Sequence, residues 1–220
     1  MNASTIFEDA KTAALVEAAQ QGDVAGVRAA IQVGANPNAL GKENATPLFV
    51  VLATTVNKPG LAALLGAGAD PNMPATQGVP PMVLVARAKD PELLRILLKG
   101  GGNPNLKASS GEPLLWLAAR DDRWDNVETL LGSGADINAV DGPGYTTVMN
   151  LASLGRYDRV AWMIEHGANV NYANSIGVTL TELVTTDQIA ATSPQYAWQQ
   201  RVIAMLEARG IKVPMPPAVK

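Results

Sequence analysis

Three acidic residues that lie close together in the sequence, Asp121, Asp122 and Asp125, are the first candidates for chemistry. Neighbouring carboxylates can act as general acid and general base. We expect these three in a turn between two helices, however, where acidic side chains cap the helix that follows. His166 stands one residue before a glycine that we expect to end a helix. Its imidazole should therefore face solvent and interact favourably with the helix dipole.

Metal and cofactor chemistry has little support in the chain. It contains 1 histidine and no cysteine, which excludes the commonest metal sites, cysteine nucleophiles and disulfides. The phosphate-binding pattern G-x-x-x-x-G-K-[ST] is absent, and we expect Gly100–Gly102 to end a helix rather than to hold phosphate. We therefore predict no catalytic residue, no metal ligand and no cofactor.

Charge and hydropathy exclude two further classes of partner. The formal net charge of the 220-residue chain is −3, with 9 basic and 8 acidic residues before position 111 and 8 basic and 12 acidic residues from there on. Neither half has the strong positive field that nucleic acid binding requires. No stretch approaches 18 apolar residues, so we expect no membrane insertion.

The N-terminal region gives an expectation about location. Met1–Leu15 lacks the charged start and apolar run of a signal peptide. We expect a cytoplasmic protein, with the periplasm as the alternative if a signal peptide has been removed.

One pentapeptide organises the chain. It occurs as GANPN at 34–38, GADPN at 68–72, GGNPN at 101–105, GADIN at 134–138 and GANVN at 167–171. The last residues of successive copies are 34, 33, 33 and 33 positions apart. A fixed period of this length is the signature of a solenoid, in which each unit stacks only on its neighbours.

Each pentapeptide predicts the end of a helix followed by an extended turn. Glycine can adopt positive φ after the last helical residue, and Asn or Asp side chains can hold a turn by bonding the local backbone. An apolar pair stands three and four residues before each glycine, and we expect both members to be buried. These pairs are Ala30-Ile31, Leu64-Leu65, Leu97-Leu98, Leu130-Leu131 and Met163-Ile164.

The segments between the pentapeptides predict two helices each. The units are expected at roughly 8–38, 39–72, 73–105, 106–138 and 139–171, followed by a modified cap at 172–212 and a flexible proline-rich tail at 213–220. In the cap, the distance from Gly167 to Gly210 is 43 residues, so the connection Thr186–Gln195 is an expansion. We expect Trp198, on the last helix, to pack between units.

The other three tryptophans are candidates either for packing between units or for partner binding. We expect Trp162 to pack between units as well. Trp116 and Trp124 are left open between packing and partner binding.

These patterns resemble the ankyrin repeat family. The family sequence runs N-x-x-D-x-x-G-x-T-P-L-H-x-A-A and ends L-L-x-x-G-A-D-x-N. This chain has Asn138-Ala-Val-Asp-Gly-Pro-Gly-Tyr-Thr146 for the first part and Leu130-Leu-Gly-Ser-Gly-Ala-Asp-Ile-Asn138 for the second. The resemblance is to bacterial-type stand-alone ankyrin repeat proteins. It implies an all-α solenoid of about five helix-turn-helix units with short hairpin loops and a modified C-terminal cap.

The chain also departs from the family pattern. The histidine that follows T-P-L is replaced by Phe49, Val83, Trp116 and Met149, so the starts of these helices must be held by packing. Asp141 is the only hairpin aspartate retained, which predicts less regular hairpins elsewhere.

The resemblance implies partner binding in a concave groove formed by the hairpins and the first helices. Carried over position by position, the family's contact sites fall on hairpin tips, on residues just before the first helices and on the exposed ends of those helices. They are Lys42, Glu43, Thr76, Gln77, Lys107, Glu112, Ser109, Arg87, Arg120, Asp121, Tyr145, Tyr172 and Asn174. Arg87 and Arg120 are 33 residues apart and should be neighbours.

The predicted function is a non-enzymatic module that binds a folded protein partner and is monomeric when free. A narrower hypothesis, which rests on the resemblance alone, is an antidote (immunity protein) that inhibits a secreted bacterial toxin. The alternatives are a passive homo-oligomeric scaffold and an enzyme or small-ligand receptor. The last would need a deep polar pocket with convergent titratable groups.

Overall fold

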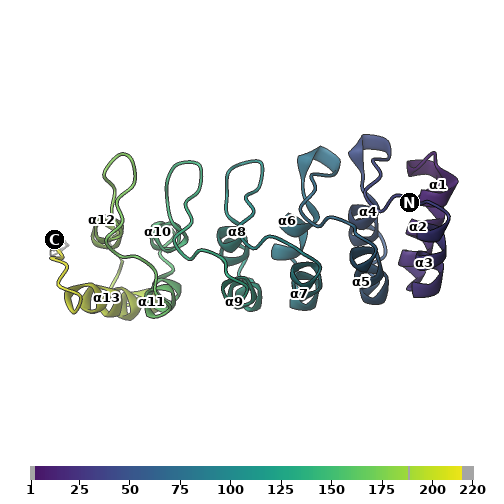
Figure 1. Cartoon of the computed structure of the whole chain (residues 1–220). Helices are drawn as coiled ribbons and strands as arrows, with labels where there is room; N and C mark the ends of the chain where they lie inside the picture. Colours follow the sequence, from purple (N-terminus) through teal and green to yellow (C-terminus); the bar gives the residue numbers. More distant parts are fainter. Residues whose placement is uncertain (1–2, 188, 215–220) are drawn as a thin grey trace.

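The computed structural model describes residues 3–187 and 189–214, and over these residues the fold is helical throughout. Most of the helices form pairs that stack side by side along one axis (Figure 1). The helices are α1 Ala3–Ile6, α2 Ala10–Gln21, α3 Val24–Gln32, α4 Pro47–Ala53, α5 Lys58–Gly66, α6 Pro81–Ala86, α7 Pro91–Lys99, α8 Leu114–Arg120, α9 Trp124–Gly132, α10 Thr147–Ser153, α11 Tyr157–Glu165, α12 Leu180–Thr186 and α13 Pro194–Glu207.

The array has two helical layers and a row of hairpins. Helices α4, α6, α8, α10 and α12 form the inner layer, helices α5, α7, α9, α11 and α13 form the outer layer, and the hairpins project from the inner side (Figure 1). One continuous core of buried apolar side chains lies between the layers and between successive units. The predicted solenoid is confirmed.

The predicted helix starts are confirmed where threonine precedes the helix. The Thr46 Oγ1 atom accepts a hydrogen bond from the Phe49 amide at 3.2 Å, and Thr146 Oγ1 accepts one from the Met149 amide at 3.4 Å. These N-caps satisfy backbone donors that the first turn of a helix leaves unpaired. Pro80 and Pro113 occupy the same position in the third and fourth units without a side-chain bond.

The pentapeptides end the outer helices as predicted. The five glycines have φ between 89° and 96°, which is the left-handed region that glycine adopts without strain. Inside each pentapeptide the third residue holds the turn: the Asn36 Oδ1 atom, for example, accepts a hydrogen bond from the Asn38 amide at 2.9 Å.

The last asparagine of the pentapeptide has a role that the sequence analysis missed. The Asn105 side chain donates to the carbonyl of Gly134 at 3.0 Å and accepts from the amide of Asp136 at 2.7 Å. Asn38 and Asn72 make the same two bonds to the next pentapeptide, and Asn138 accepts from the amide of Asn169 at 2.7 Å. This asparagine ladder joins each unit to the following one.

The expectation that both members of each apolar pair are buried is confirmed for Leu64-Leu65 and Met163-Ile164 and wrong for the other three pairs. The first member is buried in all five units, but Ile31, Leu98 and Leu131 are only half-buried. Adjacent residues on an α-helix point about 100° apart, so both cannot face the same neighbour. Leu130 is therefore the deeply buried residue of its pair.

The hairpins differ along the array, but not only where the aspartate is missing, because the fourth and last hairpins close with the same bridge as the fifth. In the fifth unit, Asp141 accepts hydrogen bonds from the Tyr145 amide and from the Asn150 side chain, both at 2.8 Å. The first two hairpins instead contain short 3-10 turns, in which Glu43 and Gln77 adopt φ of 56° and 57°. Positive φ is uncommon for residues other than glycine, so these two tips are locally strained.

The N-terminal end of the array contains a helix that the sequence analysis did not predict. Helix α1 precedes the first predicted unit, and Ala3, Ile6 and Phe7 are buried in the core cluster. At the other end, the proline-rich tail from 215 to 220 lies outside the described residues.

The expanded connection before α13 is tied to the fifth unit. The Gln195 Oε1 atom accepts hydrogen bonds from the amides of Tyr157 and Asp158, at 2.9 and 3.3 Å. The hydroxyl of the buried Tyr157 donates to Asp187 Oδ2 at 3.0 Å. Burial, and next the hydrogen bond to this carboxylate, raise the pKa of Tyr157. The expansion therefore fixes α13 against α11.

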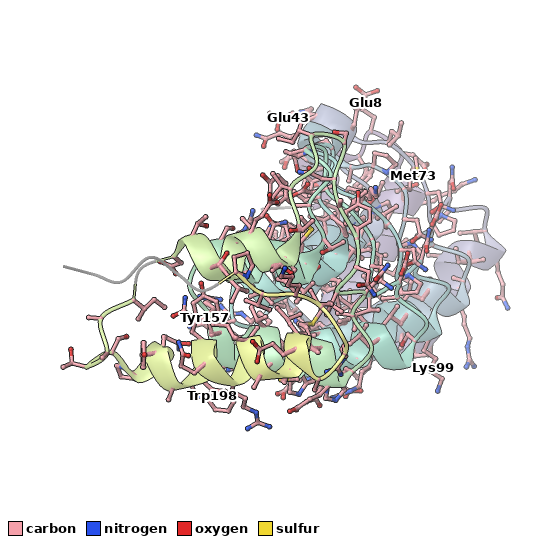
Figure 2. The ribbon with its side chains drawn as sticks, turned by 90° about the vertical axis from the view of Figure 1, so that its left-hand side faces the viewer. Glu8, Glu43, Met73, Lys99, Tyr157 and Trp198 are labelled. Atoms are coloured by element: carbon pink, nitrogen blue, oxygen red, sulfur yellow. The ribbon has the colours of Figure 1, made fainter. Side chains whose placement is uncertain are left out.

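Trp198 does not pack between units, contrary to expectation. It is 36% exposed and lies at the outer edge of α13, with the Arg201 guanidinium 5.1 Å from its ring (Figure 2). Gln199, Val202 and Leu206 form the buried face of this helix. Residue 198 precedes that face by one position, which turns it outward.

We predict that Leu130→Ala lowers the free energy of unfolding by about 2–5 kcal/mol, because it leaves a cavity at a fully buried position. Leu131→Ala should cost less, since that side chain is half-buried, and Lys107→Ala on a hairpin should cost under about 0.5 kcal/mol. Urea denaturation of the three variants measures these differences. Equal losses for Leu130 and Leu131 would contradict the assignment of faces.

A second prediction concerns the asparagine ladder. Asn105→Ala removes two hydrogen bonds between the fourth and third units and should lower the free energy of unfolding by about 1–2 kcal/mol. Ser109→Ala, at an exposed hairpin position of the fourth unit, is the control. Thermal unfolding followed by circular dichroism compares the two variants. If Asn105→Ala lowers stability no more than the control does, the ladder does not stabilise the fold.

Candidate functional site

The resemblance to ankyrin repeats places the expected concave groove along the C-terminal ends of the inner helices. Ala53, Arg120 and Ser153 are the last residues of α4, α8 and α10, and Arg87, directly after α6, occupies the same position in its unit. Regular stacking places these side chains in one row, 33 or 34 residues apart along the sequence. The row is apolar at its N-terminal end and charged at its centre.

A network of ion pairs forms the centre of the groove. The Arg87 Nε atom lies 2.6 Å from Asp121 Oδ2, and Arg120 Nε lies 3.5 Å from Asp121 Oδ1. Arg120 also pairs with Glu112, whose second oxygen accepts a hydrogen bond from Ser110 at 2.7 Å. The structure thus brings Arg87 and Arg120 together, as expected, and Asp121 is the group that joins them.

This network corrects the role expected for the acidic turn. Asp121 ends α8 and pairs with two arginines, and Asp122 accepts a hydrogen bond from the Trp124 indole at 2.8 Å. The N-cap of the following helix is Arg123, which makes no capping bond with its side chain. Asp121 therefore neutralises two arginines of the inner layer, and α9 has no side-chain N-cap, although Asp125 lies in its first turn.

The ion pairs with Arg87 and Arg120 affect the pKa of Asp121. Burial opposes ionisation of Asp121, but hydrogen bonds and charges from Arg87 and Arg120 prevail and hold the pKa of this carboxyl below its usual 3.8. Two guanidinium groups and two carboxylates make the centre of the groove neutral but strongly polar. Arg87 remains 48% exposed, so it can still contact a partner.

The two tyrosines proposed as contacts are half-buried. The Tyr172 hydroxyl donates to the Gly144 carbonyl at 3.2 Å, which joins the fifth hairpin to the next one. Asn174 is 5% exposed and accepts hydrogen bonds from the amides of Ile176 and Val178, so it holds a turn and is not available as a hairpin-tip contact.

The other proposed contacts lie along the hairpin edge. Lys42, Glu43, Gln77, Lys107 and Ser109 are exposed, and Thr76 is half-exposed. Figure 2, viewed along the array, shows Glu43 at the hairpin end of the molecule, far from Lys99 on the outer layer.

A hollow of about 400 Å³ at the N-terminal end of the groove was not predicted. Lys42, Glu43 and Thr76 border it, and Ile6 and Phe49 supply apolar surface. The sequence contained one indication of this hollow, because Phe49 replaces the family histidine on the inner helix. Ile6 could not be found in this way, since α1 lies outside the repeat pattern.

Three aromatic rings, Trp124, Trp162 and His166, form a cluster on the outer layer. The Trp124 and Trp162 rings meet edge to face with centroids 5.2 Å apart, and the His166 ring stacks on Trp162 at 3.6 Å. His166 is exposed at the end of α11, as predicted. Trp116 is buried in the core and Trp162 packs between outer helices, which settles these two residues as packing residues.

The described part of the chain contains no group of three or more His, Cys, Asp or Glu side chains that could hold a metal ion. Within residues 3–187 and 189–214, no helix is both long and apolar enough to span a membrane.

The comparison with known families agrees with this geometry. The family model for ankyrin repeats (3 copies) matches residues 50–141 and 82–174. The chain belongs to the ankyrin repeat family. Ankyrin repeats are generally an interaction fold without enzymatic activity, so the chain is a protein–protein interaction module by family.

A solved structure supports the same assignment over more of the chain. The crystal structure of EF0377, an ankyrin repeat protein, is 26% identical to this sequence, with a TM-score of 0.68. The match covers 88% of this chain and 97% of that one. Among curated proteins, no sequence matches.

We predict that Asp121→Asn destabilises the chain at neutral pH but not in acid. Because the pKa of Asp121 is lower in the folded chain than its usual 3.8, its ionised form stabilises the fold above about pH 4, and this stabilisation is lost as the pH falls further. At pH 7 the expected loss is about 0.5–1 kcal/mol, typical of partly exposed ion pairs.

Urea denaturation at pH 7 and pH 2.5 measures this effect. Glu128→Gln, at an exposed position of α9, is the control and should change little at either pH. A difference between wild type and Asp121→Asn that persisted unchanged at pH 2.5 would contradict the proposed ion pairing.

Proposed function

We propose that this ankyrin repeat chain is a non-enzymatic module that binds a folded protein through its concave groove and is monomeric when free. The observation that carries the proposal is the ion-paired row of Arg87, Asp121, Arg120 and Glu112 at the centre of the groove. These side chains are already held in place by one another. A partner would therefore lose little free energy in ordering them.

The groove offers two kinds of contact to such a partner. Its centre presents arginine, which is common at the energetic centres of interfaces, and its N-terminal end presents the apolar hollow beside Phe49. A partner with polar groups facing Arg87 and Arg120 and an apolar side chain facing Phe49 would match both. Hairpin residues Lys42 and Gln77 would then lie at the rim.

A narrower proposal is that the partner is a secreted bacterial toxin and that binding blocks its active site. Support comes from the resemblance to stand-alone bacterial ankyrin repeat proteins, some of which are antidotes, and from a groove that could cover a convex surface. The corresponding test is inhibition of an enzymatic partner at one chain per partner molecule.

We predict that the double variant Arg87→Ala, Arg120→Ala weakens partner binding at least tenfold, which corresponds to about 1.4 kcal/mol. The partner is first captured from the source organism with the wild-type chain and identified by mass spectrometry. Affinity is then measured by calorimetry, with circular dichroism to confirm folding.

The control is Arg95→Ala, Arg201→Ala. It removes two arginines that also form ion pairs, with Glu92 and Glu165, but on outer helices. The same design tests Tyr145→Ala, which we expect to weaken binding when combined with Arg120→Ala. If the control variant loses binding and the groove variant keeps it, the partner binds elsewhere and the proposal is wrong.

A further inference from the structure

The outer surface of the array contains a trough above α5. Successive outer helices carry long side chains at equivalent positions: Arg28 on α3 and Arg95 on α7 correspond to Ala62 on α5. Gln32 and Lys99 likewise correspond to Gly66. Since α5 has no long side chain at either position, its outer surface is lower than those of α3 and α7.

Two hollows mark this trough, one on each side of α5. Each has a volume of about 650 Å³, and both are lined by Ala62 and Gly66. The first lies against α3 and includes Val24 and Ile31, and the second lies against α7 and includes Ile96. Val24 is 37% exposed, so apolar surface is open to solvent here.

The walls of the trough are positively charged, although the whole chain has a formal net charge of −3. The charged residues that line the two hollows are Arg28, Glu92, Arg95 and Lys99. The single carboxylate, Glu92, lies 3.3 Å from Arg95 and is paired with it. Across residues 3–187 and 189–214, Arg28 and Lys99 form no ion pair.

The dimensions of the trough fit one α-helix. Packed helices lie about 8–10 Å apart, so α3 and α7, on either side of α5, are separated by roughly twice that distance. A helix has a diameter of about 10–12 Å with its side chains. A β-strand would find no partner here, because the backbone groups of the three helices are already bonded within each helix.

We propose that this trough binds an amphipathic helix of a partner protein, with apolar side chains in the two hollows and acidic side chains beside Arg28 and Lys99. Ala62 and Gly66 allow the close approach of the helix backbone. The proposal concerns a surface on the opposite side of the array from the concave groove, and it does not depend on the function proposed for the groove.

Gly66→Gln is the variant that tests the trough. Apart from its chain neighbours and the backbone of its own helix, a Cβ atom at Gly66 would meet no atom within 4 Å, so the added side chain fills the trough without disturbing the packing. Gly132→Gln is a matched control, because Gly132 occupies the equivalent last position of α9 and also has open space around it. Neither variant should lower the melting temperature, since glycine is unfavourable within helices.

The probe is a synthetic 20-residue helical peptide with leucines at i, i+3, i+4 and i+7 and glutamates beside them. A second peptide carries lysines in place of the glutamates. Both are titrated into the isotopically labelled full chain, and amide chemical shifts are recorded. We expect shifts in α3, α5 and α7, with binding of the glutamate peptide at least tenfold tighter than that of the lysine peptide.

Gly66→Gln should weaken binding of the glutamate peptide at least tenfold, and Gly132→Gln should leave it unchanged. Equal binding of both peptides, equal affinity of Gly66→Gln and wild type, or no shifts at millimolar peptide would overturn the proposal. Sedimentation of the chain alone completes the test. Self-association that Gly66→Gln abolishes would assign the trough to a second copy of the chain and would also overturn it.

Discussion

The structure depends on the constraint that every unit must stack in the same register on the next. The asparagine ladder imposes this constraint, because each side chain bonds both an amide and a carbonyl, or at the last junction an amide, of the following pentapeptide. The glycines beside it reverse the chain at positive φ and bring those backbone groups within reach. Residues 33 apart therefore become neighbours in space, and both the groove and the outer trough are consequences of that alignment.

The sequence predicted what is encoded locally and repeated. Helix starts at Thr46 and Thr146, the glycine helix ends and the adjacency of Arg87 and Arg120 all follow from spacing and backbone chemistry. Features that depend on three-dimensional context were missed: α1 lies outside the repeat, Trp198 faces outward because of helix register, and Asp121 pairs with an arginine of the preceding unit. The contact residues of the groove remain predictions, because partner binding leaves no local signature in the chain.

The two faces of the array differ in whether their charged side chains form ion pairs. In the groove, arginines and carboxylates pair with one another, so the surface is polar, ordered and close to neutral. On the outer layer above α5, the cations outnumber the carboxylates, and within the part of the chain that the structure describes Arg28 and Lys99 form no ion pair. A single array can thus present one surface suited to specific polar contacts and another suited to an acidic segment, without any change in fold.

The bonds that tie the last connection to the fifth unit have a further consequence for local unfolding. In a linear array the terminal units have only one neighbour and open first. Here Gln195 bonds the first amides of α11, and Tyr157 bonds Asp187, so α13 cannot detach while α11 keeps these bonds. Opening at this end should therefore involve α11 and α13 together, as one cooperative segment. Amide hydrogens in α13 would then exchange as slowly as those of α11.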